Sequence, residues 1–256
     1  MKNKFILSAI LFTIIFFGVI SHVNAQANID VESGAVFTGY NNVRISGEAG
    51  TLFSLKNDLN AQPNAFIRIR AGYTIKSRHT ISLLYAPLFV KSNGLTNKQI
   101  DFEGVSFPSN IALNASYKFN SYRITYRYDI VKRSKFEFGL GFTAKIRDAE
   151  IALNSEGLAA SKKNLGFVPI INFRLNWKIS NKIGVLFEGD ALAAPQGRAE
   201  DVILAGTYKF SDQFMVRLGY RILEGGADND EVYNFALFHY ASVGVTYTFK
   251  NKLKSN

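Results

Sequence analysis

The sequence predicts an all-β protein, a closed antiparallel up-and-down transmembrane β-barrel of about twelve strands, with ten strands as the alternative. Three observations lead to this prediction. Segments of about ten residues alternate apolar and polar side chains, the apolar rows end in aromatic residues, and an apolar leader precedes them. Hydrophobic residues make up 47% of the 256 residues, which excludes a disordered chain. The chain has no cysteine, so disulfides and cysteine-ligated metal centres are also excluded.

The first 25 residues predict a secretory signal peptide. Lys2 and Lys4 precede an apolar run over residues 5–20, and residues 23–25 place small side chains where a signal peptidase cuts. A retained anchor helix is the alternative, but the apolar run is short for a bilayer. We therefore expect residues 26–256 to form one exported barrel domain.

Rows of apolar residues at every second position predict the strands in chain order. In the first row Ile67, Ile69 and Tyr73 are apolar, and Arg68 and Arg70 alternate with them. Similar rows run over residues 111–119, 122–130, 136–146, 167–179, 214–222 and 241–249. The apolar side of every row, including Leu113, Ala115, Tyr117 and Phe119, is expected to face lipid.

The polar sides of these rows distinguish a membrane barrel from a soluble β-sandwich. They carry Gly, Ser, Thr, Asn and paired charges, which suit an enclosed interior better than a solvated surface. Aromatic residues at Tyr73, 117–119, 208–210 and 247–249 resemble the girdle at a membrane boundary. Because a sheet in a bilayer tolerates no open edge, such strands must close into a barrel.

The leader, the amphipathic strands and a final strand over residues 243–249 that ends in an aromatic residue resemble a Gram-negative outer-membrane β-barrel protein. The resemblance implies a location in the bacterial outer membrane. It also implies contact with outer-membrane lipids and lipopolysaccharide, and recognition of the last strand by the outer-membrane assembly machinery. The basic charges are spread through strands and turns, so nucleic acid is not an expected partner. The oligomeric state stays open.

The strand count depends on the turns. Short polar connections are expected at residues 76–79, 132–134, 180–182 and 211–213, and longer ones at 46–64, 91–98, 154–165, 192–198 and 224–234. In membrane barrels the short turns are periplasmic and the long loops are outside. This rule gives twelve strands if residues 99–107 form a strand and residues 120–121 a tight outer turn. If residues 99–107 are a loop, the count is ten.

The polar rows face the barrel interior, where the predicted basic residues outnumber the acidic ones. Two interpretations follow. The charges pair with one another and plug the barrel, since unpaired charge in a confined site is costly. Alternatively, the basic excess lines a narrow passage that favours anions. The predicted basic lumen residues are Arg68, Arg70, Arg123, Arg127, Lys145, Arg147, Arg174, Arg217 and Arg221, and the acidic ones are Asp129, Glu137, Glu188 and Asp190.

The predicted function is an integral outer-membrane barrel that is either structural or a narrow porin-like pore for small anionic solutes. An outer-membrane enzyme acting on lipid or peptide at the rim is the alternative. His79 and His239 have their nearest downstream serines three residues away, on the opposite face of a regular strand, so neither forms a Ser–His pair there. No catalytic residue, metal or cofactor is assigned.

Acidic residues gather in one predicted outer loop. Asp228, Asp230 and Glu231, together with His239, resemble only crudely the paired acids and histidine of an aspartyl-type barrel protease. The same three acids and Glu224 form a candidate rim cation site, because oxygen ligands next to glycines suit calcium. A solvated hairpin tip is the simpler interpretation of this loop.

Overall fold

The structure is a computed structural model that describes residues 25–195 and 197–250. The predicted signal peptide lies outside the described residues except for Ala25, where the first strand begins. No helix in the described ranges is long and apolar enough to span a membrane.

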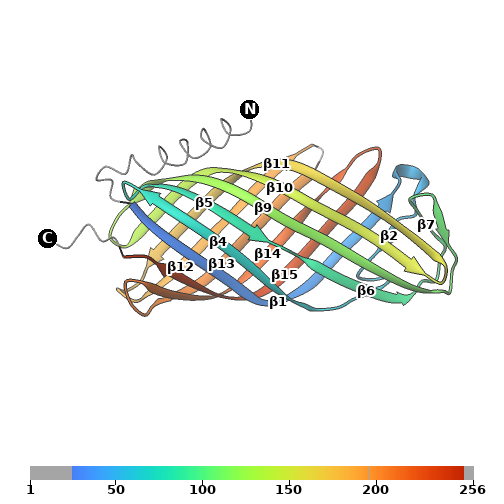
Figure 1. Cartoon of the computed structure of the whole chain (residues 1–256), viewed down its shortest axis with the longest axis horizontal. Helices are drawn as coiled ribbons and strands as arrows, with labels where there is room; N and C mark the ends of the chain where they lie inside the picture. Colours follow the sequence, from blue (N-terminus) through green and yellow to red (C-terminus); the bar gives the residue numbers. More distant parts are fainter. Residues whose placement is uncertain (1–24, 196, 251–256) are drawn as a thin grey trace, which may run out of the picture.

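Ten strands of the described chain close into an antiparallel barrel (Figure 1). β1 pairs with β15 on one side and with β4 on the other, which closes the barrel. β5 and β6 both pair with β9, one after the other, and are counted together as one barrel strand. The barrel strands are β1 (Ala25–Ile45), β4 (Asn64–Ile75), β5 (His79–Ala86) with β6 (Phe89–Leu95), β9 (Ala112–Lys132), β10 (Phe136–Ser155), β11 (Leu158–Lys178), β12 (Ile183–Ala194), β13 (Gly197–Lys209), β14 (Phe214–Asp228) and β15 (Val232–Thr248). Shorter elements at one end are η1 (Gly47–Ala49), β2 (Phe53–Ser54), β3 (Asn60–Ala61), β7 (Ile100–Phe102) and β8 (Val105–Phe107).

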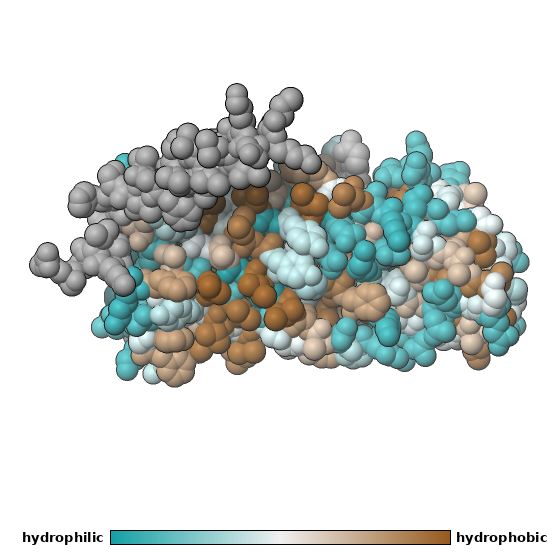
Figure 2. Space-filling view, in the orientation of Figure 1, coloured by the Kyte–Doolittle hydropathy of each residue, from teal (hydrophilic) through white to brown (hydrophobic). Residues whose placement is uncertain are grey.

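The predicted apolar rows form an outward belt in the half of the barrel where β1 begins. Figure 2 shows apolar residues gathered in this half and polar residues covering most of the other half. An apolar surface of this extent is stable only in contact with lipid. Exposed belt residues include Ile69, Tyr73, Leu83, Ile124, Tyr126, Phe142, Ile171, Trp177, Leu204, Leu218 and Val243.

The predicted short turns lie together at the end of the barrel where β1 begins and β15 ends. They connect β4 to β5, β9 to β10, β11 to β12, and β13 to β14, which confirms the predicted positions of these turns. The opposite end carries the long connection from β1 to β4 and the β7–β8 hairpin, of which β7 is labelled at the right of Figure 1. By the usual asymmetry of membrane barrels, the first end is periplasmic and the second is external.

The prediction of twelve strands is wrong, and the ten-strand alternative is correct. Residues 99–107 form the separate β7–β8 hairpin, which pairs with no barrel strand in the described ranges. Glu103 (φ 49°) and Gly104 (φ 75°) make its turn, and two positive φ angles in succession are the geometry of a tight two-residue hairpin. Residues 120–121 lie inside the continuous strand β9, so no turn occurs there.

The predicted lipid contact of residues 111–119 is also wrong. Leu113, Ala115 and Tyr117 are buried inside the barrel, whereas Ile124 and Tyr126 farther along the same strand face outward. The apolar side of β9 therefore changes from inner to outer where the strand enters the membrane belt. Above the belt water surrounds the barrel, so apolar side chains are stable only inside it.

The predicted loop 154–165 is mostly strand. β10 and β11 pair along their whole length from Phe136–Trp177 to Ser155–Leu158, and only Glu156 and Gly157 form the turn between them. With β9 these strands have 20 or 21 residues each, about twice what a tilted membrane crossing needs. The barrel wall consequently extends far beyond the belt on the external side.

The external end of the barrel is closed by a hydrophobic cap, defined here as residues 46–64 and the β7–β8 hairpin. Phe53 from the first segment packs edge-on against Phe102 from the second, with ring centroids 6.3 Å apart. Thr51 and Asp101 join the two segments, since the Thr51 amide donates to the Asp101 carbonyl at 2.9 Å. Hydrogen bonds from Ser106 and Gln99 hold the pKa of the Asp101 carboxyl below its ordinary value. The cap belongs to one buried apolar cluster with Leu113, Tyr117, Leu153, Leu223 and Phe238 of the wall.

Candidate functional site

At the height of the membrane belt the barrel interior is filled by a layer of ion pairs, which we call the ion-pair layer. Asp201 of β13 is its centre. Its carboxylate accepts from Arg68 at 2.8 Å, Arg123 at 2.6 Å and Arg221 at 2.5 Å. Asp201 is paired across the β12–β13 ladder with Asp190, and two carboxylates so placed repel each other. The three arginines offset that repulsion.

Two acids of β1 extend the layer to the other side of the barrel. Glu32 accepts from Arg221 Nε at 2.8 Å, from Arg217 Nη2 at 2.9 Å and from the Ser242 hydroxyl at 2.8 Å. Asp30 accepts from both terminal nitrogens of Arg217. A bidentate arginine–carboxylate pair of this kind fixes both side chains in direction.

Two acids of β12 complete the layer. Asp190 accepts from Arg123 at 2.6 Å, from the Thr143 hydroxyl at 2.7 Å and from the Asn172 amide at 2.9 Å. Glu188 forms an ion pair with Arg70 and lies 3.4 Å from Arg174 and 3.9 Å from Arg127. All five acids of the ion-pair layer are buried.

Three of these acids were missed from the sequence, namely Asp30, Glu32 and Asp201. The period-two alternation of residues 28–33, with Ile29 and Val31 facing outward, is the signal that could have found the first two. Their omission made the lumen look more basic than it is. The arginines of the layer are matched by acids, so at this height the interior favours pairing over a free anion path.

The other predicted lumen residues lie below and above this layer. Toward the periplasmic end, Arg127 lies 3.6 Å from Asp129, and Lys178 donates to Glu137 at 2.6 Å. Toward the external end lie Lys145 and Arg147 of β10, which border a pocket instead of the ion-pair layer.

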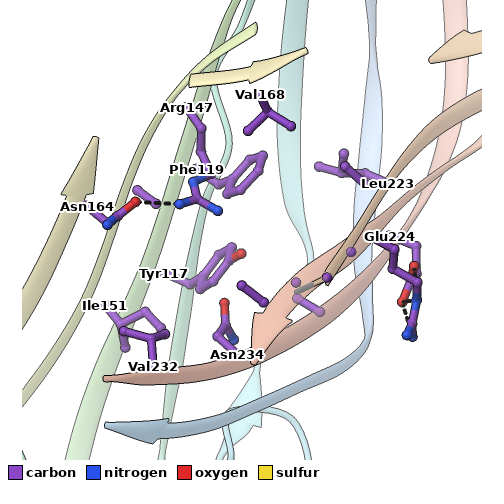
Figure 3. A pocket seen from close by; sticks show the side chains of 18 of the residues that line it. Tyr117, Phe119, Arg147, Ile151, Asn164, Val168, Leu223, Glu224, Val232 and Asn234 are labelled. Carbon is purple, nitrogen blue, oxygen red and sulfur yellow. Dashed lines mark hydrogen bonds and ion pairs between the residues drawn. The ribbon is translucent and has the colours of Figure 1, made fainter. Parts of the chain in front are cut away.

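This pocket, in the external half of the barrel, has a volume of about 430 Å³. Figure 3 shows Tyr117, Phe119 and Arg147 on one wall and Leu223 and Glu224 on the other. The volume lies within the range of roughly 300–1,000 Å³ that small-molecule sites occupy. Its apolar lining includes Ile45, Tyr117, Phe119, Ile151, Phe167, Val168, Leu192, Leu223, Val232, Ala236 and Phe238, and its charged lining is Lys145, Arg147, Glu150, Lys162, Arg198 and Glu224.

Lys145 differs from every arginine of the ion-pair layer. It is 3% exposed, yet no ion pair or hydrogen bond to its ammonium group occurs within the described ranges. Its Nζ lies 4.7 Å from the centre of the Phe119 ring, a cation–π contact that replaces only part of the lost hydration. Burial without an anionic partner disfavours the protonated form of an amine, so an anion in the pocket would stabilise the Lys145 ammonium group.

Two more basic residues border the pocket. Arg147 donates to Asn164, and its Nε has no partner among the described residues. Arg198 is held by Glu224, with Nη2 2.7 Å from Oε1, and Tyr40 donates to the same carboxylate. Arg198 is therefore paired with an acid, whereas Lys145 and Arg147 form no ion pair among the described residues.

The candidate rim cation site is not assembled. Glu224 is bound to Arg198, and Glu231 lies 3.5 Å from Lys162. In residues 25–195 and 197–250, no three acidic, histidine or cysteine side chains lie close enough together to hold a metal ion. Glu224 and Glu231 pair with basic residues of neighbouring strands instead of with the other acids of the β14–β15 turn.

The two histidines of the barrel lie apart from the serines next to them in sequence. His239 contacts the Tyr220 hydroxyl on the outer side of the wall, whereas Ser242 points inward to Glu32. His79 lies at the periplasmic end, with Nδ1 2.9 Å from the Tyr126 hydroxyl. Among the described residues, neither histidine therefore forms a hydrogen bond with a serine.

Comparison with known proteins connects this architecture to outer-membrane barrels. No family model matches the sequence, and no curated protein matches it. Among solved structures, the outer membrane protease OmpT from Escherichia coli is similar over 88% of this chain and 97% of that chain, with 10% identity and a TM-score of 0.53. An outer membrane channel from Pseudomonas putida F1 (9% identity, 91% and 98% covered, TM-score 0.41) and Ail of Yersinia pestis (10% identity, 88% and 99% covered, TM-score 0.38) are more distant.

The closed barrel, its outward apolar belt and this shared fold define the class of the protein. It is a transmembrane β-barrel, and its fold is that of Gram-negative outer-membrane β-barrel proteins. At 10% identity, the likeness to OmpT concerns the fold alone.

Proposed function

We propose that this protein is a binding barrel, closed to ions within the membrane, that holds a small anionic solute with an apolar part in the pocket of its external half. The observation that carries the proposal is Lys145, a buried ammonium group without an anionic partner among the described residues, at the edge of an otherwise largely apolar cavity. Arg147 adds a second positive charge on the same strand. The apolar wall favours an organic anion over an inorganic one, because burial of its carbon skeleton adds to the charge interaction.

Substitution of Lys145 tests this proposal directly. The Lys145→Met variant is expected to bind 1-naphthoate at least about tenfold more weakly than the unmodified protein, a loss of about 1.4 kcal/mol. Calorimetric titration of the refolded protein in detergent measures the affinity, and neutral 1-naphthamide is the ligand control. Lys163→Met is the matched protein control, because the largely exposed Lys163 of β11 does not line the pocket. Equal affinities of the Lys145 variant and the unmodified protein for 1-naphthoate would refute the proposal.

A narrow anion passage is the second candidate function. It is favoured by basic residues on both sides of the ion-pair layer, with Lys145 and Arg147 externally and the half-exposed Arg174 and Lys178 toward the periplasm. Such a passage needs the ion-pair layer to open during transport. A protease function like that of OmpT is not proposed, since no histidine in the described residues contacts a serine or a pair of acids.

Single-channel recording separates the two candidates. In planar bilayers the purified protein is expected to give no sustained conductance, because the buried ion pairs occupy the lumen where an ion would cross. A general porin inserted in the same bilayer is the positive control. Steady openings that pass chloride in preference to potassium would instead favour the anion passage and contradict a closed binding barrel.

A further inference from the structure

The barrel wall beside the pocket is incomplete. β11 and β12 pair only from Lys178–Gly184 to Ile171–Ala191, and β12 turns back at Ala194. β11 continues outward from that point to Leu158, paired with β10 alone among the described strands. Asn164, Phe167 and Val168 on this part of β11, and Leu192 and Ala194 on β12, all line the pocket. We call this interruption the lateral window.

The lateral window lies at the external edge of the membrane belt. Phe167 is the pairing partner of Ile146 on β10, and Ile146 is in turn the pairing partner of Tyr122 on β9, so the three residues lie at the same height. The ring of Tyr122 stacks on that of Tyr85 in the outer part of the belt, with ring centroids 5.2 Å apart. Leu165 and Phe167 are 75% and 68% exposed on the outward face of β11. Side chains this apolar and this exposed, level with aromatic belt residues, indicate contact with the outer lipid leaflet.

An unpaired strand edge at this height requires a polar neighbour. Backbone amides and carbonyls left without hydrogen bonds in hydrocarbon are costly, so membrane sheets normally have no edge. Irregular backbone is tolerated there only where it lines a cavity that admits water or polar groups. The open edge of β11 beside the pocket fits a passage that polar groups enter.

The pocket adjoins the apolar cluster that contains the cap. Ile45 and Ile151 line the pocket and belong to the same buried cluster as Phe53 and Phe102 of the cap. Lys162 crosses the top of the lateral window, 3.2 Å from Glu103 of the β7–β8 turn and 3.5 Å from Glu231 of the β14–β15 turn. The lateral window is the place beside the pocket where neighbouring wall strands do not pair.

We infer that the pocket is filled sideways from the outer leaflet through the lateral window, and that its ligand is a single acyl chain ending in a carboxylate. This inference rests on the proposed function and specifies its ligand and route. The carboxylate lies against Lys145 and Arg147, which have no anionic partner among the described pocket residues. The chain lies along Val168, Leu192 and the other apolar lining residues toward lipid. A cavity of about 430 Å³ suits one chain better than a two-chain lipid.

Ligand chemistry is tested with cis-parinaric acid, a fluorescent fatty acid, added to the refolded full-length protein in detergent. Saturable binding is expected, with displacement by decanoate but not by decanol. Lys145→Met is expected to weaken binding by about tenfold or more, and Lys163→Met to leave it unchanged. Equal displacement by decanoate and decanol would overturn the assignment of a carboxylate.

The route is tested by narrowing the lateral window with Ala194→Trp, because Ala194 lines the pocket at the turn of β12. Ala193→Trp is the matched control, because its side chain is on the opposite, outward face of the same strand and does not line the pocket. In vesicles preloaded with cis-parinaric acid, Ala194→Trp is expected to slow association and dissociation by about tenfold while the equilibrium affinity changes little.

The outcomes distinguish the two proposals. If the unmodified protein binds neither 1-naphthoate nor cis-parinaric acid, the proposed function itself fails. If it binds cis-parinaric acid in a Lys145-dependent manner but Ala194→Trp and Ala193→Trp show the same rates in vesicles, the pocket is real and the lateral route is wrong. Slower exchange in Ala194→Trp alone supports the route. Both variants must first show the gel shift between unboiled and boiled samples that marks a folded barrel.

Discussion

Replacing Asp201 with alanine is expected to lower the free energy of unfolding of the barrel by about 3–5 kcal/mol, the cost typical of removing one member of a buried charge network. Asp201 is the shared partner of Arg68, Arg123 and Arg221. Without it Arg68 loses its ion pair, and the other two arginines keep only one acidic residue each. Three guanidinium groups are then held close together inside the barrel with less negative charge between them.

The measurement is urea unfolding of the protein in lipid vesicles, followed by the fluorescence of Trp177, the single tryptophan, which lies on the lipid-facing side of β11. Asp212→Ala is the matched control, because Asp212 pairs with Lys209 in an exposed periplasmic turn. Its unfolding midpoint is expected to equal that of the unmodified protein. The unfolding midpoint of Asp201→Asn should lie between those of Asp201→Ala and Asp212→Ala, since the asparagine can still accept a hydrogen bond but has no charge. An Asp201→Ala midpoint equal to that of the control would show that the ion-pair layer contributes little to stability.

Replacing Phe102 with alanine is expected to destabilise the external half of the barrel by about 3–5 kcal/mol, the range found when a buried aromatic residue is truncated. Phe102 is 0% exposed and packs against Phe53, so its loss leaves a cavity in the cap. The belt and the ion-pair layer are separate from this cluster. Loosening of the cap alone, with the membrane barrel intact, is the expected consequence.

Limited trypsin digestion of vesicle-embedded protein measures this local opening, with Lys56 and Lys98 in or beside the cap as cleavage sites. The Phe102→Ala variant should be cut faster at these sites and keep its gel shift on boiling. Leu95→Ala is the control, because Leu95 is largely exposed at the end of β6 and its truncation removes no core contact. Equal cleavage rates for the two variants would contradict the view that the cap is held by buried packing.

Much of the membrane-facing structure could be predicted from the sequence because its cause is local. Alternation such as Ile67–Arg68–Ile69 specifies a strand with one apolar and one polar side, whatever its neighbours are. Within the membrane belt, the apolar side of each strand faces the surrounding lipid and the polar side faces the enclosed interior. Accordingly, Arg68, Arg123 and Arg221 were predicted to face the lumen, and the structure places them there.

The functional pocket could not be predicted in the same way. The sequence predicts that Lys145 faces the lumen. Nothing near it in sequence indicates that it lacks an anionic partner among the described residues. Arg123, which pairs with Lys145 across the β9–β10 ladder, has two acidic partners, Asp190 and Asp201. Pairings such as Arg217 with Asp30 join residues 187 positions apart, and only closure of the barrel brings them together. The lateral window likewise depends on β12 being shorter than β11.

Period-two alternation is a property of each strand alone, so the sequence was enough to predict a membrane barrel, the positions of its short turns and the side chains that share a face. The folded barrel was needed to show that the apolar residues Leu113 and Tyr117 point inward although the apolar Ile124 of the same strand points outward. A strand pattern records that two faces differ, but the medium on each side at a given height determines which face is apolar. That medium changes from lipid to water where β9 leaves the belt.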